Sequence, residues 1–114
     1  MELYYVSHPN GGVKKNVDAA DEIVKKLSAK YPDDCYVSPI HAIRVPYKET
    51  PYEVGLGYCL ELLRHCECIV MAGDWRSSTG CLVEYFLAKE WGKTIYDADV
   101  LLSDEPGVEE DDEE

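Results

Sequence analysis

An apolar run, a glycine-bracketed turn and a helix follow one another in the second half of the chain, and this stretch constrains the fold most. The run Cys68–Ala72 is typical of a fully buried strand, and the polar segment Gly73–Gly80 ends it. The helix that follows carries a single ionisable residue, Glu84, between Cys81 and Ala88. Glu84 heads an apolar stripe that continues through Leu87, Ala88 and Trp91. Because burial disfavours a charged carboxylate, a glutamate on such a stripe requires a partner or a chemical role.

Strand-like and helix-like segments alternate along the whole chain. The expected strands are Leu3–Ser7, Cys35–Ser38, Cys68–Ala72 and Thr94–Tyr96. The expected helices are one capped by Asn16, one that starts near Pro51 and one that ends at Gly92, whereas residues 39–50 show no period. Such alternation predicts right-handed βαβ units and a parallel sheet covered on both faces. We therefore expect an α/β fold that binds ligands beyond the carboxyl ends of its strands.

Two polar loops lie at that edge of the expected sheet, and each has two interpretations. The first loop, Ser7–Gly12, has the glycines that a phosphate site needs, but it could be an ordinary turn. The second loop, Gly73–Gly80, could bind a ligand, or its polar residues could simply cap the helix. Trp75 could be a surface aromatic or part of an interface, and Glu84 could be a half-exposed partner of Lys89 or Lys93.

The charge is distributed unevenly over the 114 residues. The net charge is −12, but eight of the 23 acidic residues follow Ser103, which leaves 15 acidic against 11 basic residues before it. A body of that charge is unsuited to polymeric nucleic acid, which requires a basic stripe, but it does not exclude a single nucleotide. We predict one domain over residues 1–97 and an acidic, disordered tail over residues 98–114.

The cysteines and the apolar segments indicate a cytoplasmic protein. The five cysteines are odd in number and lack the paired spacing of a zinc site, so we expect reduced structural thiols and no metal or other cofactor. No stretch approaches the roughly 18 apolar residues that span a bilayer. The first ten residues lack the pattern of a signal peptide. We expect no membrane partner.

Several short motifs resemble those of the nucleoside 2-deoxyribosyltransferase-like superfamily. Tyr5–Pro9 resembles its Tyr-apolar-small-Gly-Pro opening, and Cys66–Val70 is similar to its Cys-Asp-x-Ile-Val sequence. Gly73–Trp75, followed by Ser78-x-Gly80-x-x-x-Glu84, resembles its signature loop and nucleophile helix. The resemblance spans roughly residues 3–96 and continues through Ala88 and Gly92-Lys93. It is nearest to short phage and bacterial members and to the deoxynucleoside 5′-monophosphate N-glycosidases.

The resemblance implies a flavodoxin-like three-layer sandwich with a four- to five-stranded parallel sheet, assembled as a homodimer or higher homo-oligomer. It implies cleavage of, or transfer across, the N-glycosidic bond of a 2′-deoxynucleoside 5′-monophosphate, with Glu84 as nucleophile and Tyr5 beside it. Ser78, six residues before Glu84, would bind the phosphate. The other residues that the resemblance places at the substrate are Ser7, His8, Gly11, Gly12, Asp74, Trp75 and Gly80.

Three positions depart from the superfamily pattern. His8 stands where a glycine is usual, and Glu67 stands where aspartate is common. Cys59, eight residues before Glu67, occupies the position of a second acid that assists the departing base. Asp74, Glu61 or a neighbouring subunit could supply that proton instead. A non-catalytic nucleotide-binding module, for sensing or sequestration, is therefore the alternative function.

Overall fold

The computed structural model describes residues 1–103, which form four strands, five α-helices and two 3₁₀ turns. In chain order these are β1 (Leu3–Ser7), α1 (Lys14–Lys30), β2 (Cys35–Val37), α2 (Pro39–Ala42), η1 (Tyr47–Glu49), α3 (Tyr52–Arg64), β3 (Cys68–Met71), η2 (Trp75–Ser77), α4 (Thr79–Glu90), β4 (Thr94–Asp97) and α5 (Ala98–Leu101). The expected alternation of strands and helices is confirmed.

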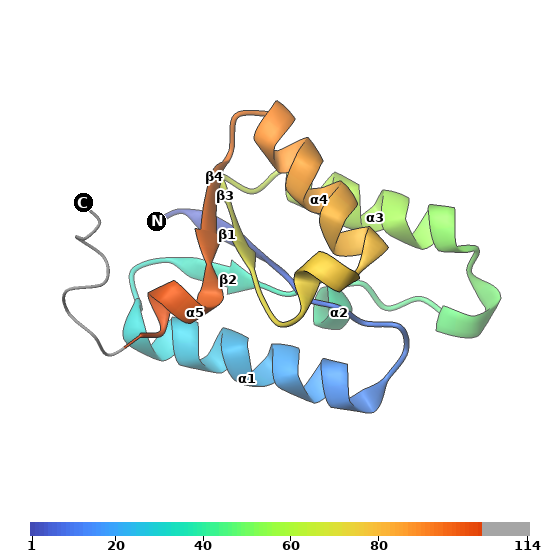
Figure 1. The fold of residues 1–114 in the computed structure, drawn as a ribbon, viewed down its shortest axis with the longest axis horizontal. Helices are drawn as coiled ribbons and strands as arrows, with labels where there is room; N and C mark the ends of the chain where they lie inside the picture. The colour runs from blue at the N-terminus through green and yellow to red at the C-terminus, as the bar shows by residue number, and fades with distance from the viewer. Residues whose placement is uncertain (104–114) are drawn as a thin grey trace.

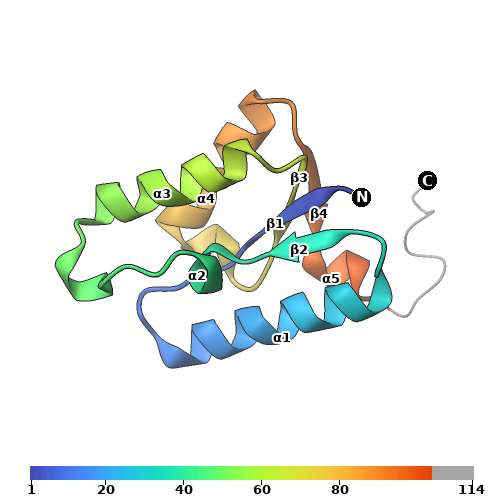
Figure 2. The same ribbon diagram turned by 180° about the vertical axis from the view of Figure 1, so that it is seen from behind.

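The four strands form one parallel sheet in the order β2-β1-β3-β4. Helices α1 and α5 cover one face of the sheet, and α3 and α4 cover the other (Figures 1 and 2). This arrangement confirms the predicted flavodoxin-like sandwich, with four strands. Strand order reverses between β1 and β3, where Ser7 lies opposite Met71 at the carboxyl ends. In open parallel sheets this reversal creates the crevice where ligands bind.

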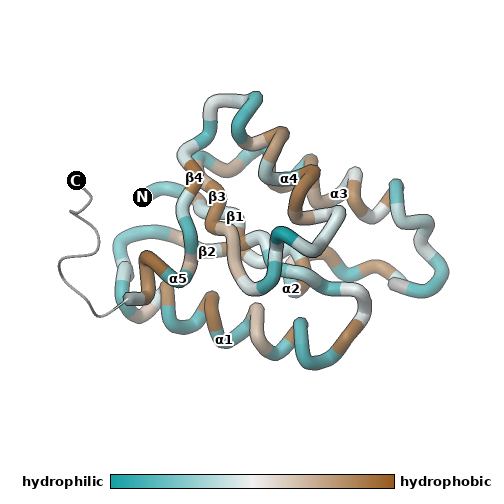
Figure 3. Tube along the Cα trace, in the orientation of Figure 1, coloured by the Kyte–Doolittle hydropathy of each residue, from teal (hydrophilic) through white to brown (hydrophobic). Residues whose placement is uncertain are grey.

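Side chains of β1 alternate between two cores, one on each face of the sheet. Tyr4 and Val6 pack on the α1 side with Leu27, whereas Tyr5 packs on the α3–α4 side with Leu63. Figure 3 shows hydrophobic residues recurring along α1 between hydrophilic ones, which is the pattern of a helix with one buried face. Strand position therefore decides which β1 side chains can reach α4.

The start of α1 differs from the sequence prediction. The helix begins at Lys14 with Val13 as its N-cap, so Asn16 lies inside the first turn. Its side-chain amide donates to the Asn10 carbonyl oxygen at 3.0 Å instead of capping the helix. Gly11 and Gly12 adopt positive φ angles of 58° and 70°, which turn the chain sharply enough for the helix to start earlier.

Residues 39–50, expected to be irregular, contain two short helical turns. Pro39 occupies the first position of α2, where its fixed φ and missing N–H suit a helix start. Pro46 is the N-cap residue that precedes η1. Helices this short bury too little to leave a periodic hydrophobic pattern in the sequence.

Folded structure continues beyond residue 97, where the sequence predicts the acidic tail to begin. Ala98 is only 2% exposed and belongs to the core on the α1 side. The Lys30 ammonium and the Tyr31 hydroxyl both donate to the Leu101 carbonyl oxygen at 2.7 Å, and these bonds attach α5 to the end of α1. The predicted disorder of residues 104–114 lies outside the described residues.

Three of the five cysteines are core residues as predicted, whereas Cys35 is exposed and Cys59 is half-buried, and three predicted strand ends differ by one residue. Cys66, Cys68 and Cys81 are buried, and all five cysteines are unpaired thiols. Gly92, with φ of 74°, follows the last residue of α4 and its cap. None of the helices within residues 1–103 is both long and apolar enough to cross a bilayer.

Candidate active site

A pocket of about 750 Å³ opens beyond the carboxyl ends of the strands. It is bounded by the loop after β1, by the segment from α2 into α3, and by the first turns of α4. This volume is within the usual range for pockets that hold small molecules. Glu84 is one of its lining residues.

Two hydroxyl groups of β1 donate hydrogen bonds to the Glu84 carboxylate. The Tyr5 hydroxyl donates to Oε2 at 2.5 Å, and the Ser7 hydroxyl donates to Oε1 at 2.6 Å. Tyr5 and Ser7 are fully buried, and they share the α4 side of β1 because they are two positions apart. Both carboxylate oxygens are therefore bonded on the protein side, and the carboxylate is fixed in orientation.

Burial dominates the electrostatics of this cluster. Glu84 is 6% exposed, and desolvation raises its pKa above the usual value although bonds from Ser7 and Tyr5 act in the opposite direction. Burial, together with the nearby Glu84 charge, raises the pKa of Tyr5 well above its usual value. Tyr5 therefore keeps its proton and acts as a permanent donor to the carboxylate.

The structure excludes the interpretation of Glu84 as a half-exposed partner of a lysine. Its buried carboxylate accepts hydrogen bonds from the two β1 hydroxyls. The Lys93 ammonium instead donates to the carbonyl oxygens of Cys66, at 2.6 Å, and Arg64, at 3.1 Å. Within residues 1–103 Glu84 forms no ion pair, and a buried, unpaired carboxylate in a cleft is a mark of functional sites.

His8 lines the pocket, and contacts with Pro9 and Gly73 fix the orientation of its imidazole ring. Its Nδ1 lies 2.7 Å from the Pro9 carbonyl oxygen, which can only accept, so Nδ1 carries a proton. Its Nε2 packs over Gly73, where the Cβ of any larger residue would lie only 2.6 Å from it. The imidazole thus occupies the space that a side chain at position 73 would need.

Gly73→Ala should therefore destabilise the fold by roughly 1–3 kcal/mol, because alanine would be strained at the positive φ and would collide with His8. Gly57→Ala is the matched control, since nothing lies within 4 Å of a Cβ there and position 57 is inside α3. That control should be neutral or stabilising by up to ~1 kcal/mol. Denaturant unfolding of both variants measures the difference, and equal stabilities would contradict the packing of His8 on Gly73.

Ser78 and Gly80 lie together where α4 begins at the pocket. Ser78 is the N-cap of α4, and its hydroxyl oxygen accepts from the Cys81 amide at 3.3 Å. Its hydroxyl hydrogen is not needed for that bond. A Cβ at Gly80 would lie 3.1 Å from the Tyr52 hydroxyl oxygen, so glycine leaves room for the end of that side chain.

Gly11 and Gly12 also line the pocket, in the turn before α1. The Gly12 amide donates to the Asn10 side-chain oxygen at 3.2 Å, so this N–H is already bonded within the loop. Lys14 follows directly and pairs with Asp18 at 2.6 Å in an exposed position. Lys14 and Lys48 are pocket-lining cations that sequence reasoning did not single out.

Trp75 and Asp74 are not among the residues that line this pocket. Trp75 is 8% exposed and stacks on Tyr85 at a centroid distance of 5.1 Å, which excludes a surface position. It borders a second, smaller hollow of about 200 Å³. Asp74 is exposed, and its carbonyl oxygen accepts from the Ser77 amide in η2.

An aliphatic part of the pocket lining was not identified from the sequence. It is formed largely by Pro39, Ile40, Ile43, Val45 and Leu56. The available signal was position in the chain, because most of these residues follow the carboxyl end of β2, on the same edge of the sheet as both polar loops.

Cys59 lines the pocket from α3, at the position where the superfamily resemblance places a second acid. Burial raises the pKa of its thiol to about 11, and the neighbouring Glu84 charge adds to the shift. Within residues 1–103 there is no cluster of three or more His, Cys, Asp or Glu side chains suited to a metal.

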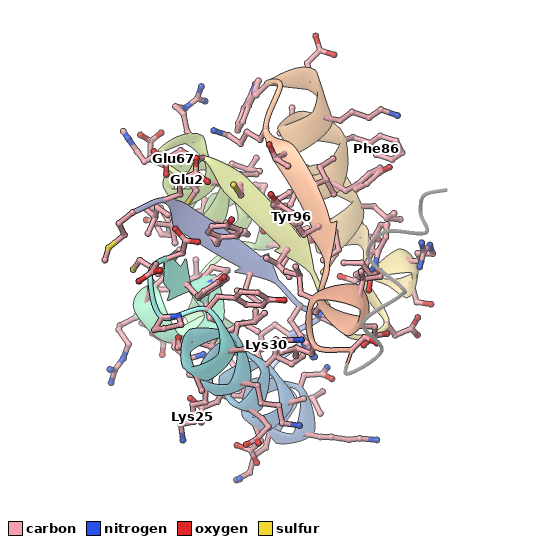
Figure 4. All side chains as sticks on the ribbon, turned by 90° about the vertical axis from the view of Figure 1, so that its left-hand side faces the viewer. Glu2, Lys25, Lys30, Glu67, Phe86 and Tyr96 are labelled. Carbon is pink, nitrogen blue, oxygen red and sulfur yellow. The ribbon has the colours of Figure 1, made fainter. Side chains whose placement is uncertain are left out.

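Glu67 acts at the opposite end of the sheet from the pocket. Its carboxylate accepts from the Leu3 amide at 2.6 Å and so fastens the start of β1. Figure 4 shows Glu67 beside Glu2 at this end of the strands. Glutamate at this position therefore serves strand pairing.

The four-stranded parallel sheet between two helical layers defines the chain as a flavodoxin-like α/β protein. The structure is similar to that of the 2-desoxiribosyltransferase from Leishmania mexicana, with a TM-score of 0.61 and 19% sequence identity. The match covers 85% of this chain and 63% of the other, and at this identity it shows the shared fold. The chain belongs to the family described as Domain of unknown function (DUF4406), whose model matches residues 2–97. No curated protein sequence matches it significantly.

Proposed function

We propose that the protein cleaves the N-glycosidic bond of a 2′-deoxynucleoside 5′-monophosphate, or transfers its deoxyribosyl group, with Glu84 as the nucleophile. One observation carries the proposal: a buried carboxylate that lines the pocket has both oxygens held by hydroxyl donors from the central strand. A carboxylate fixed in this way can stabilise positive charge that develops at the anomeric carbon and then bond to it. The fold shared with a deoxyribosyltransferase supports the same class of reaction.

Two lysines and the N-terminal end of α4 lie at the pocket, and they favour a substrate that carries a phosphate group. Lys14, Lys48 and the N-terminal end of α4 all favour an anion. The Ser78 hydroxyl can donate to a phosphate, because its cap interaction with the Cys81 amide uses only the oxygen. The aliphatic wall provides an apolar surface for the base. Tyr5 and Ser7, behind Glu84, would act as positioning residues.

Incubation with a panel of deoxynucleoside monophosphates, followed by chromatography of free base, tests the proposal directly. Release of base by the native protein is the expected result, and binding without release would favour the second candidate, a nucleotide-binding module. Cys59 is the observation that favours the second candidate, because a thiol stands where an assisting acid is expected. Absence of both binding and release across the panel would refute both functions.

Ser78→Ala should weaken monophosphate binding by roughly tenfold or more, because a hydrogen bond to a charged group contributes on the order of 1.5–3 kcal/mol. Affinity for the unphosphorylated nucleoside should change little. The variant also loses the α4 cap and should be less stable by about 0.5–2 kcal/mol, so affinities are compared well below its melting temperature. Ser77→Ala, at an exposed neighbouring position, is the control. Equal losses for both ligands would leave Ser78 with the capping role alone.

Activity should be lost on the acid side at an apparent pKa above the 4.5 of an ordinary glutamate, because Glu84 attacks only when ionised and burial raises its pKa. The raised pKa of Glu84 has the opposite consequence for stability, which increases on acidification while activity decreases. Between the unfolded and folded pKa values the folded chain binds the proton more tightly, so acidification through this window stabilises the fold and a rise in pH removes that gain. A pH–rate profile with its acid limb at or below 4.5 would contradict the assignment.

A further inference from the structure

The pocket contains one carboxyl group where N-glycoside cleavage usually employs two acid–base groups. Among the pocket-lining residues of the described chain, Glu84 alone has a carboxylate. The other two acids considered from the sequence lie elsewhere: Glu61 is exposed and bonded to His65 at 3.0 Å, and Asp74 is exposed outside the lining. If Glu84 is the nucleophile, no carboxylic acid among the described pocket-lining residues is left to protonate the departing base.

The two hydroxyl groups of β1, the Cys59 thiol and the His8 imidazole do not replace that acid. The protons of Tyr5 and Ser7 are donated to Glu84 itself. Cys59 is a weak acid here, since burial raises its pKa to about 11. The His8 Nδ1 proton is directed at the Pro9 carbonyl oxygen, and Nε2 is packed over Gly73.

We place the base against the aliphatic part of the pocket lining, whereas polar side chains such as Thr50 and Tyr52 line other parts. Ile40, Ile43, Val45 and Leu56 present aliphatic surface. A flat ring can stack on such a wall, and a positive charge on the ring would be attracted to the Glu84 carboxylate.

We propose that the substrate is a nucleotide whose base carries a fixed positive charge on its ring, such as an N7-alkylated purine or a pyridinium nucleotide. This inference rests on the proposed function and specifies the substrate class of the same site. Such a base departs as a neutral molecule and needs no proton. One carboxylate, two positioning hydroxyls and phosphate-binding cations are then a sufficient set of groups.

The bonds and charges of the reaction balance without an acid. A Glu84 oxygen forms a bond to C1′ while the bond from C1′ to the ring nitrogen breaks, and its electron pair cancels the charge of the ring. Water then attacks C1′, the Glu84 ester bond breaks, and one proton is released as the carboxylate is regenerated. Aliphatic surroundings disfavour the charge that the base carries before cleavage, and cleavage removes that charge.

The test compares 2′-deoxyguanosine 5′-monophosphate with its N7-methyl derivative, which differ by one methyl group and one charge. Free base is measured by chromatography with the full native chain, and the rate without protein is subtracted for each nucleotide. We expect kcat/KM for the methylated nucleotide to be about 10²-fold higher or more, since general-acid assistance is typically worth 10²–10⁴-fold. Comparable values for the two nucleotides would overturn the inference and leave the proposed function standing. Release from neither would contradict both.

Position 59 supplies a second, internal comparison. Cys59→Asp places an acid beside the base and should raise turnover of the unmethylated nucleotide by about 10²-fold relative to turnover of the methylated one. Cys59→Asn is the matched control, with the same shape and no acidic proton, and should leave the ratio between the nucleotides as in the native protein. An equal response of both nucleotides to Cys59→Asp would overturn the inference. If the melting temperature of that variant is too low for assay, the native comparison decides alone.

Discussion

Glu84→Gln should reduce base release by roughly 10³-fold or more, because the side chain keeps its shape but loses the charge that attacks the anomeric carbon. Binding of the monophosphate should survive, since the phosphate contacts proposed for Ser78, Lys14 and Lys48 do not involve Glu84. Single-turnover assays measure the first effect, and isothermal titration calorimetry measures the second.

Glu90→Gln is the control for that experiment. Glu90 is exposed at the end of the same helix, so its amide variant tests for any general effect of removing a negative charge from α4. Near-normal turnover by Glu84→Gln, or an equal loss in both variants, would contradict the nucleophile assignment.

Tyr5→Phe should lower turnover by about 10- to 100-fold, because it removes one hydrogen bond to a buried charged group, worth on the order of 1.5–3 kcal/mol. The bond from Tyr5 holds down the pKa of Glu84, so its loss should also move the acid limb of the pH–rate profile to higher pH. A purely structural defect would lower turnover without moving that limb.

Tyr4→Phe provides the matched comparison for Tyr5. The two tyrosines are adjacent in β1, but Tyr4 belongs to the opposite core, where its ring lies 4.8 Å from that of Tyr36. Tyr4→Phe should leave the pH profile unchanged. If both variants shift the profile equally, the hydrogen bond from Tyr5 is not what positions Glu84.

The strands and the longer helices were predictable because their signals are local. The Cys68–Ala72 run and the stripe below Glu84 each reflect burial along one element. The bonds from Tyr5 and Ser7 to Glu84 are different, since they join residues 79 and 77 positions apart. Hydrophobic periodicity cannot show that β1 lies beside β3 under α4, and only the superfamily resemblance suggested that Tyr5 acts with Glu84.

The pocket wall and the last helix were not predictable for a related reason. Residues 39–50 form two single turns, and α5 has four residues, so neither leaves a periodic pattern. Ala98 is buried because it packs against α1-side residues such as Leu27, which are far away in the chain. Local composition marked residues 98–103 as part of an acidic tail, and tertiary packing overrode it.

The packing of His8 on Gly73 shows how a departure from a motif can be accommodated. The histidine stands where the resemblance leads us to expect a glycine, and its ring packs over Gly73, just after the end of β3. His8 and Gly73 are 65 residues apart in sequence, and the position of the His8 ring requires glycine at position 73. A single sequence does not reveal such a pairing.

The stereochemistry of transfer to methanol tests the central claim, attack by Glu84 on the anomeric carbon, most directly. With methanol as acceptor, two successive displacements at C1′ should give the methyl 2-deoxyribofuranoside 5-phosphate with the β configuration of the substrate retained. Proton NMR of the product distinguishes the β from the α anomer. Retention is the result that a Glu84 nucleophile predicts, and inversion or a mixture of anomers would contradict it.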